Sequence, residues 1–156
     1  MALFAGGLVQ LLAGMWEVPH GNTFGATAFS SYGAFWMSYA TIFIPGSGVM
    51  DTFQDNMDEF NQAFGLFLIV WFMITVMFIP PVLRKNVAFS TLLSLLAMAL
   101  LLLSVGSWNQ MPSVNRAGGA FGVMTGLVAF YIGVSMMLAA EKTAIIRLPL
   151  GVLSEE

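Results

Sequence analysis

The chain has 156 residues, of which 58% are hydrophobic and only 8% are charged. A soluble domain carries roughly 25% charged residues, so this composition excludes an ordinary soluble fold and indicates an integral membrane protein. The net charge of −3 and the absence of a basic patch argue against nucleic acid as a partner. The sequence has no cysteine, which excludes disulfides and thiolate metal sites.

Five apolar segments are long enough to cross a membrane as helices, which takes roughly 17–25 residues. They are residues 2–18, 23–44, 61–79, 87–107 and 116–140. The first begins without the basic region of a signal peptide, so we interpret it as a membrane span. Prolines fall in the connections, where helices are expected to stop. We predict an all-α fold, a polytopic helix bundle with five transmembrane helices. One domain spans residues 1–156 and ends in a tail at 141–156.

The placement of Lys and Arg predicts the orientation of the bundle. Arg84, Lys85, Lys142 and Arg147 share one side with the C-terminus, and Arg116 lies on the other. We therefore expect a cytoplasmic C-terminus, and the plasma membrane as location. Five spans would then put the N-terminus outside with no signal to carry it there. We expect that one preceding helix is missing from this sequence, and a five-helix protein is the alternative.

Four polar residues lie in or beside the first predicted span, where polar groups are costly and are usually functional. Gln10 is at mid-span, so its amide must hydrogen-bond a neighbouring helix or water. A role in joining helices and a contact with a substrate are equally expected. Glu17 and His20 fit either a solvated helix end or a proton relay. Asn22 also suits the N-cap of the following helix.

The second predicted helix carries an aromatic stripe. Its members are Phe29, Tyr32, Trp36, Tyr39 and Phe43. Such a stripe is usually packing or an interfacial anchor. Tyr32 stands out because it should lie nearest to mid-membrane and carries a hydroxyl, so it is either a packed tyrosine or a pore residue.

The last predicted helix carries small residues on one face. They are Gly118, Gly122, Gly126, Ala129 and Gly133, at spacings of four and three. Small residues let helix backbones approach closely, so the pattern favours helix packing. The functional alternative is a smooth face that lines a permeation path.

Several enzyme and metal motifs are absent from the sequence. It has no phosphate-binding glycine loop, and its single histidine cannot join a histidine-rich metal site. The acidic run at 51–59 lacks the spacing of a calcium loop, and no Ser–His–Asp set can be assembled. We therefore predict no catalytic residue, no metal and no cofactor, and favour a channel or transporter.

Several motifs resemble one transporter family. The first two helices read GGxxQxxAGMWE at 6–17 and GNTFGxTAFSSYGxFW at 21–36, with LLSVG at 102–106 and LPLG at 148–151. This pattern resembles the acetate/succinate uptake transporters of microbes and fungi. The resemblance implies six helices, both termini in the cytoplasm, and hexamers with one pore in each subunit. This chain would hold the second to sixth helices, without the Asn-Pro-Ala-Pro-Leu-Gly-Leu motif of the first.

The resemblance also implies roles for particular residues. Family members have a hydrophobic constriction of a phenylalanine, a tyrosine and a leucine; the last two map onto Tyr32 and Leu96. Ala129 maps onto a small position near the pore that bears on substrate size. Three polar residues map onto the pathway, namely Gln10, Glu17 and Asn22.

These implications predict proton-coupled transport of acetate and related short-chain carboxylates, with succinate as a further substrate. The expected partners are the carboxylate, membrane lipid and further copies of the chain. Two alternatives stay open. One is a truncated membrane scaffold without transport activity, and the other is an ammonia or weak-acid channel.

Overall fold

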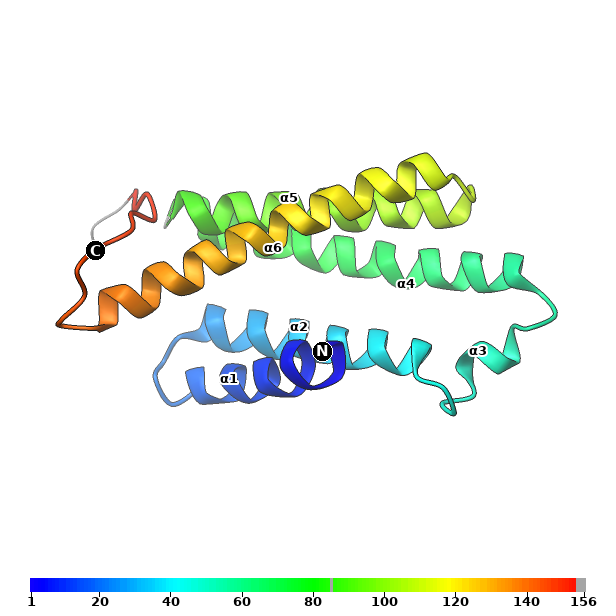
Figure 1. The fold of residues 1–156 in the computed structure, drawn as a ribbon, viewed down its shortest axis with the longest axis horizontal. Coiled ribbons are helices and arrows are strands. Elements are labelled where there is room, and N and C mark those ends of the chain that lie inside the picture. The colour runs from blue at the N-terminus through cyan, green and yellow to red at the C-terminus, as the bar shows by residue number, and fades with distance from the viewer. Residues whose placement is uncertain (85, 154–156) are drawn as a thin grey trace. The chain divides into compact units, whose positions relative to one another are not determined.

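The computed structural model describes residues 1–84 and 86–153, so Lys85 and the last three residues of the predicted tail lie outside the described residues. The described chain is helical and holds no β-strand, which confirms the predicted all-α fold (Figure 1). A π-helix, Ala2–Val9, leads into α1. The α-helices are α1 (Gln10–Glu17), α2 (Thr23–Phe43), α3 (Val49–Thr52), α4 (Met57–Phe78), α5 (Val87–Trp108) and α6 (Pro112–Ala140). A 3₁₀ turn, Pro80–Val82, follows α4.

Three stretches in the described part of the chain are long and apolar enough to cross a membrane. They are Met57–Val82, Val87–Trp108 and Pro112–Ala140. The apolar helix Ala2–Glu17 is shorter. α2 has 21 residues, but its threonine, serine and tyrosine side chains lower its hydropathy.

The chain divides into two compact units, Met1–Phe60 and Asn61–Glu156. The division falls within the first turns of α4, and each unit is described by itself. The prediction of one transmembrane domain stays a prediction.

In the first unit, the π-helix and α1 run antiparallel to α2 at very short separation (Figure 1). A Cβ added at Gly33 would lie 2.6 Å from the backbone nitrogen of Leu11 and 2.9 Å from the carbonyl oxygen of Gly7. A Cβ at Gly14 would lie 2.5 Å from the backbone nitrogen of Ser30. Only glycine permits backbones to approach so closely, which is the logic of small-residue helix packing.

In the second unit, side-chain hydrogen bonds join α4 to α5. The Ser104 hydroxyl donates to the carbonyl oxygen of Gly65 at 2.8 Å. The indole of Trp108 donates to the carbonyl oxygen of Gln62 at 3.1 Å. Ser104 is fully buried, so its hydroxyl needs this partner.

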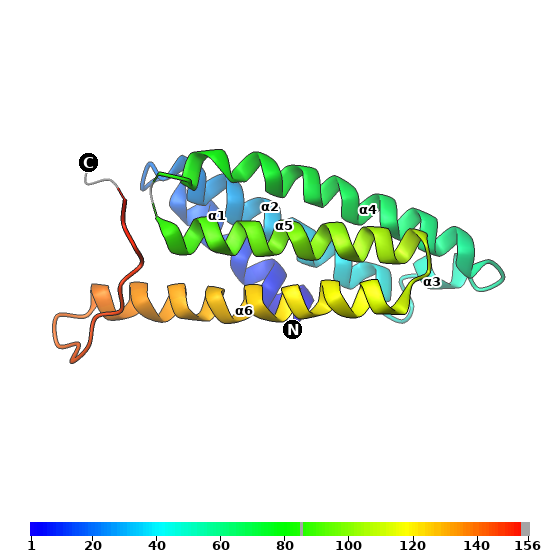
Figure 2. The same ribbon diagram turned by 90° about the horizontal axis from the view of Figure 1, so that it is seen from above.

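α5 and α6 form an antiparallel hairpin (Figure 2). Gly118 of α6 packs against Leu103 of α5. The sequence places Pro112 in the connection, but the structure puts it at the first positions of α6. Proline is favoured there because its missing N–H has no partner in the first turn of a helix.

After α6 the chain returns to the start of α5. Residues 148–152, which we name the strap, contact both helices through backbone and side-chain hydrogen bonds. Asn86 and Val152 form an isolated antiparallel β-bridge at this place.

Candidate functional site

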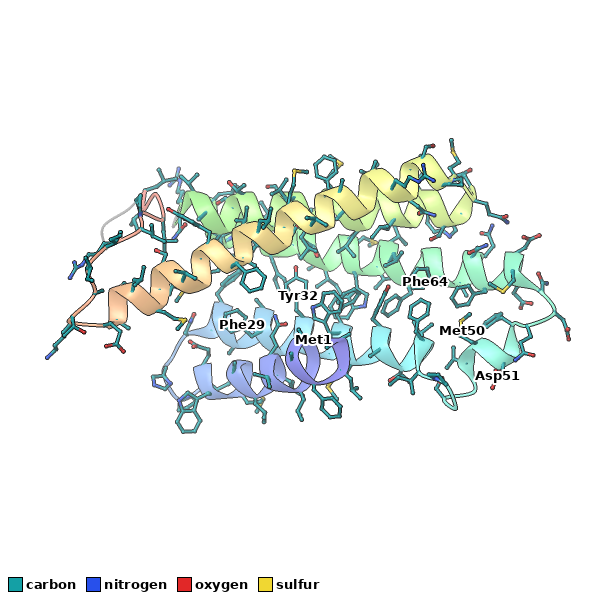
Figure 3. The ribbon with its side chains drawn as sticks, in the orientation of Figure 1. Met1, Phe29, Tyr32, Met50, Asp51 and Phe64 are labelled. Atoms are coloured by element: carbon teal, nitrogen blue, oxygen red, sulfur yellow. The ribbon has the colours of Figure 1, made fainter. Side chains whose placement is uncertain are left out.

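Tyr32 lies on the face of α2 that is turned away from α1. Figure 3 shows Phe29 and Tyr32 projecting from this helix. The α1-facing side is marked by Ser30 and Gly33, which contact the first helix. Tyr32 is 9% exposed, so its side chain is largely buried. A tyrosine hydroxyl can serve as a hydrogen-bond donor.

Three further members of the aromatic stripe, Trp36, Tyr39 and Phe43, pack within the first unit. The rings of Trp36 and Tyr39 lie 5.8 Å apart, and those of Tyr39 and Phe43 lie 5.0 Å apart. Phe43 continues the series to Phe60 at 6.3 Å. These edge and tilted contacts are typical of aromatic packing.

The turn between α1 and α2 carries Glu17, His20 and Asn22, of which Glu17 and Asn22 are hydrogen-bonded to each other. The amide of Asn22 donates to Glu17 Oε2 at 2.7 Å, and its Oδ1 accepts from the backbone N–H of Gly25 at 3.0 Å. Asn22 therefore caps α2, as the sequence predicts, and also holds the carboxylate. His20 Nδ1 lies 2.8 Å from the carbonyl oxygen of Trp16, so this nitrogen carries the hydrogen.

Gln10 lies apart from this turn. It is the first residue of α1, at the point where the π-helix ends, and its side chain is half-buried. π-helical segments are rare and often occur at functional sites. Its predicted contact with a helix or a substrate stays a prediction.

The second unit carries the other predicted pore residues. Leu96 is half-buried on α5, and Ala129 is exposed on α6. Tyr32 belongs to the first unit, so its meeting with Leu96 at one constriction stays a prediction.

The predicted glycine face of α6 is used unevenly within the chain. Gly118 packs on Leu103, whereas a Cβ at Gly122, Gly126 or Gly133 would meet nothing within 4 Å. The helix packing predicted for these three residues stays a prediction.

Sequence reasoning missed several positions. Gly33 and Ser104 make close or buried contacts, and the Oδ1 of Asn115 is buried without a partner beside Gly106. Asn115 sits next to Arg116 at the start of an apolar span, and that polar pair was the available signal. Among residues 1–84 and 86–153, no group of three His, Cys, Asp or Glu side chains could hold a metal ion.

The long apolar helices and the all-α architecture define a polytopic α-helical membrane protein. Residues 1–154 match the GPR1/FUN34/yaaH family, and the chain belongs to that family. This match, together with the similarity to an acetate permease and to a bacterial acetate channel described next, confirms the resemblance that the motifs indicated.

The chain is similar to several curated fungal proteins, including two whose names describe transport. It is similar to acetate permease A of Emericella nidulans, with 46% identity over 141 residues, covering 84% of this chain and 47% of that protein. It is similar to ammonia transport outward protein 2 of Saccharomyces cerevisiae, with 36% identity over 155 residues, covering 99% and 55%. The chain thus spans about half the length of these curated relatives.

One solved structure resembles the chain closely. The bacterial acetate channel SatP matches with a TM-score of 0.84 and 28% identity, covering 96% of this chain and 80% of that one.

Proposed function

We propose that this chain contributes to a membrane transporter or channel for acetate and related short-chain carboxylates. The observation that carries the proposal is the likeness to a bacterial acetate channel over 96% of the chain. The similarity to an acetate permease points to the same substrate class. The proposed protein is not an enzyme and needs no cofactor or metal.

The proposed passage is narrow, with Tyr32 and Leu96 forming an apolar constriction. Moving a carboxylate ion into an apolar environment costs far more than moving the neutral acid, so such a constriction favours the protonated or nearly dehydrated substrate. The Tyr32 hydroxyl and the Gln10 amide would supply hydrogen-bond donors, without a fixed cation that would trap the anion. Ala129 would limit substrate size.

Transport is proposed to be coupled to protons, with succinate among the substrates. Glu17 and His20, held at the α1–α2 turn beside Asn22, would exchange protons at a cytoplasmic mouth. We further propose a plasma-membrane protein with a cytoplasmic C-terminus that assembles as a hexamer in membrane lipid.

Uptake of labelled acetate tests the proposal. The chain, and an extended version with one further transmembrane helix placed before residue 1, are expressed in cells stripped of their own acetate carriers. We expect acetate uptake by the extended version, faster at acidic external pH. If the extended version reaches the membrane and takes up no acetate, the transport proposal is refuted and the non-transporting scaffold is favoured.

Two substitutions test the proposed selectivity positions. We expect Leu96→Ala and Ala129→Gly to raise the uptake of larger carboxylates relative to acetate, because each widens the passage. Leu101→Ala is the matched control, since Leu101 is also half-buried and lies on another face of α5. If a well-expressed variant shows the same uptake of larger carboxylates relative to acetate as Leu101→Ala, its position does not limit substrate size.

The second candidate is an ammonia channel, favoured by the similarity to an ammonia transport outward protein. The pH dependence of flux separates the two functions. Flux of a weak acid rises as pH falls, whereas flux of neutral methylamine rises with pH because deprotonation supplies the permeating form. Methylammonium flux without acetate flux would support the ammonia channel.

A further inference from the structure

The strap offers a row of carbonyl oxygens to two helices. Its first two carbonyls accept from α6. The Ser135 hydroxyl donates to Leu148 O at 2.6 Å, and the Tyr131 hydroxyl donates to Pro149 O at 2.6 Å. Ser135 is only 3% exposed, so its hydroxyl is committed to this contact.

The next two carbonyls accept from α5. The backbone N–H of Ala88 donates to Leu150 O at 3.2 Å, and that of Val87 donates to Gly151 O at 2.9 Å. The first amides of a helix have no partner within the helix, and its N-terminus favours negative charge. The strap therefore caps α5 from outside, while Asn86 Oδ1 accepts from Ala88 and Phe89.

The sequence of the strap suits this position. Gly151 has a φ of 67°, which L side chains rarely adopt. A Cβ at Gly151 would also lie 3.0 Å from Val87 Cβ. Pro149 has no N–H to satisfy and keeps Leu148 extended. The proline and the glycine of the LPLG motif thus suit the backbone conformation that the strap needs to reach α5.

We propose that the strap is a positioning clasp that fixes the start of α5 to the last turns of α6, and so sets the spacing between Leu96 and Ala129. Leu96 follows the clasped residue Val87 by about 2.5 helical turns, and Ala129 lies within one turn of Tyr131. Because helices are stiff over such lengths, a clasp at this end controls the distance between the two side chains. The selectivity role rests on the proposed transport function.

The first experiment measures the clasp itself. Amide hydrogen exchange at the start of α5 is compared in the purified full chain and in the double variant Tyr131→Phe/Ser135→Ala. We expect amide exchange at Val87 and Ala88 to become at least about tenfold faster, because the double variant removes both hydroxyl donors that hold the strap on α6. Ser38→Ala is the matched control, because its hydroxyl donates to Ala34 O within α2 at 2.8 Å.

A second variant reaches the same result without changing α6. Gly151→Val keeps the hydroxyls of Tyr131 and Ser135, but a valine is strained at this positive φ and its Cβ would crowd Val87. It should therefore also speed amide exchange at Val87 and Ala88. If both variants exchange at the same rates as the unaltered chain, the proposal that the strap fixes the start of α5 is overturned.

The second experiment measures selectivity in the transporting protein. We expect Tyr131→Phe/Ser135→Ala and Gly151→Val each to raise the uptake of a four-carbon monocarboxylate relative to acetate by a few-fold. The control Ser38→Ala should leave this ratio unchanged. Faster exchange with an unchanged ratio would overturn the positioning role. Absence of acetate uptake by the extended version without these substitutions would refute the proposed function, while the exchange rates would still decide whether the strap holds the start of α5.

Discussion

Two groups of glycines in this chain have opposite surroundings. In the first unit, Gly14 and Gly33 lie where the backbones of two helices almost touch. On α6, Gly122, Gly126 and Gly133 face open space within the chain. The sequence draws attention to α6, because its glycines repeat at regular spacing, yet the tight contact is made in the first unit. Regular spacing therefore identifies a face but does not identify what the face contacts.

The largest loss of folding stability is expected for Gly33→Ala. The atoms that a new Cβ would strike belong to the backbone of Leu11 and Gly7 and cannot rotate away. Overpacking of this kind costs about 3 kcal/mol, so the variant should unfold at clearly lower temperature in detergent. A melting temperature equal to that of the unaltered chain would show that the two helices separate easily.

A smaller loss of folding stability is expected for Gly7→Ala. Here the nearest atom is the flexible Cγ of Met37, at 2.5 Å from the added Cβ. We expect a loss of about 1–2 kcal/mol, part of which Met37→Ala should restore. A double-mutant cycle on thermal unfolding measures this coupling, and strictly additive effects would contradict the contact.

The smallest effect is expected for Gly126→Ala, which should slightly raise folding stability. Alanine favours a helix over glycine by up to about 1 kcal/mol, and no neighbouring atom in the chain opposes the added methyl group. The monomer in detergent should therefore melt slightly higher. A lower melting temperature, appearing only when copies of the chain associate, would instead support the predicted packing on this face.

The sequence predicted the helices well where local signals set their ends. Asn22 and Asn86 mark the starts of α2 and α5, and both cap their helices through side-chain oxygens. α4 begins at Met57, earlier than predicted, because Asn56 Oδ1 accepts from the N–H of Glu59. Asp58 and Glu59 then favour the positive end of that helix. Hydropathy outweighed these capping signals in the prediction.

The candidate site was less accessible to sequence reasoning. The bond between Glu17 and Asn22 joins near neighbours in the chain, so a short turn could suggest it. Ser104 bonds a residue far away in the sequence, and Tyr131 bonds the strap across a turn of irregular chain. No local periodicity encodes such contacts, because they depend on how helices meet.

The strap also has a consequence for the order in which the protein is made. Val87 and Ala88 leave the ribosome before any of α6, but their carbonyl partners are made only after α6 is complete. Until then Asn86 alone caps the start of α5. The helix is therefore started by a local cap and finished by a distant one, so the final geometry of this hairpin is fixed late in biosynthesis.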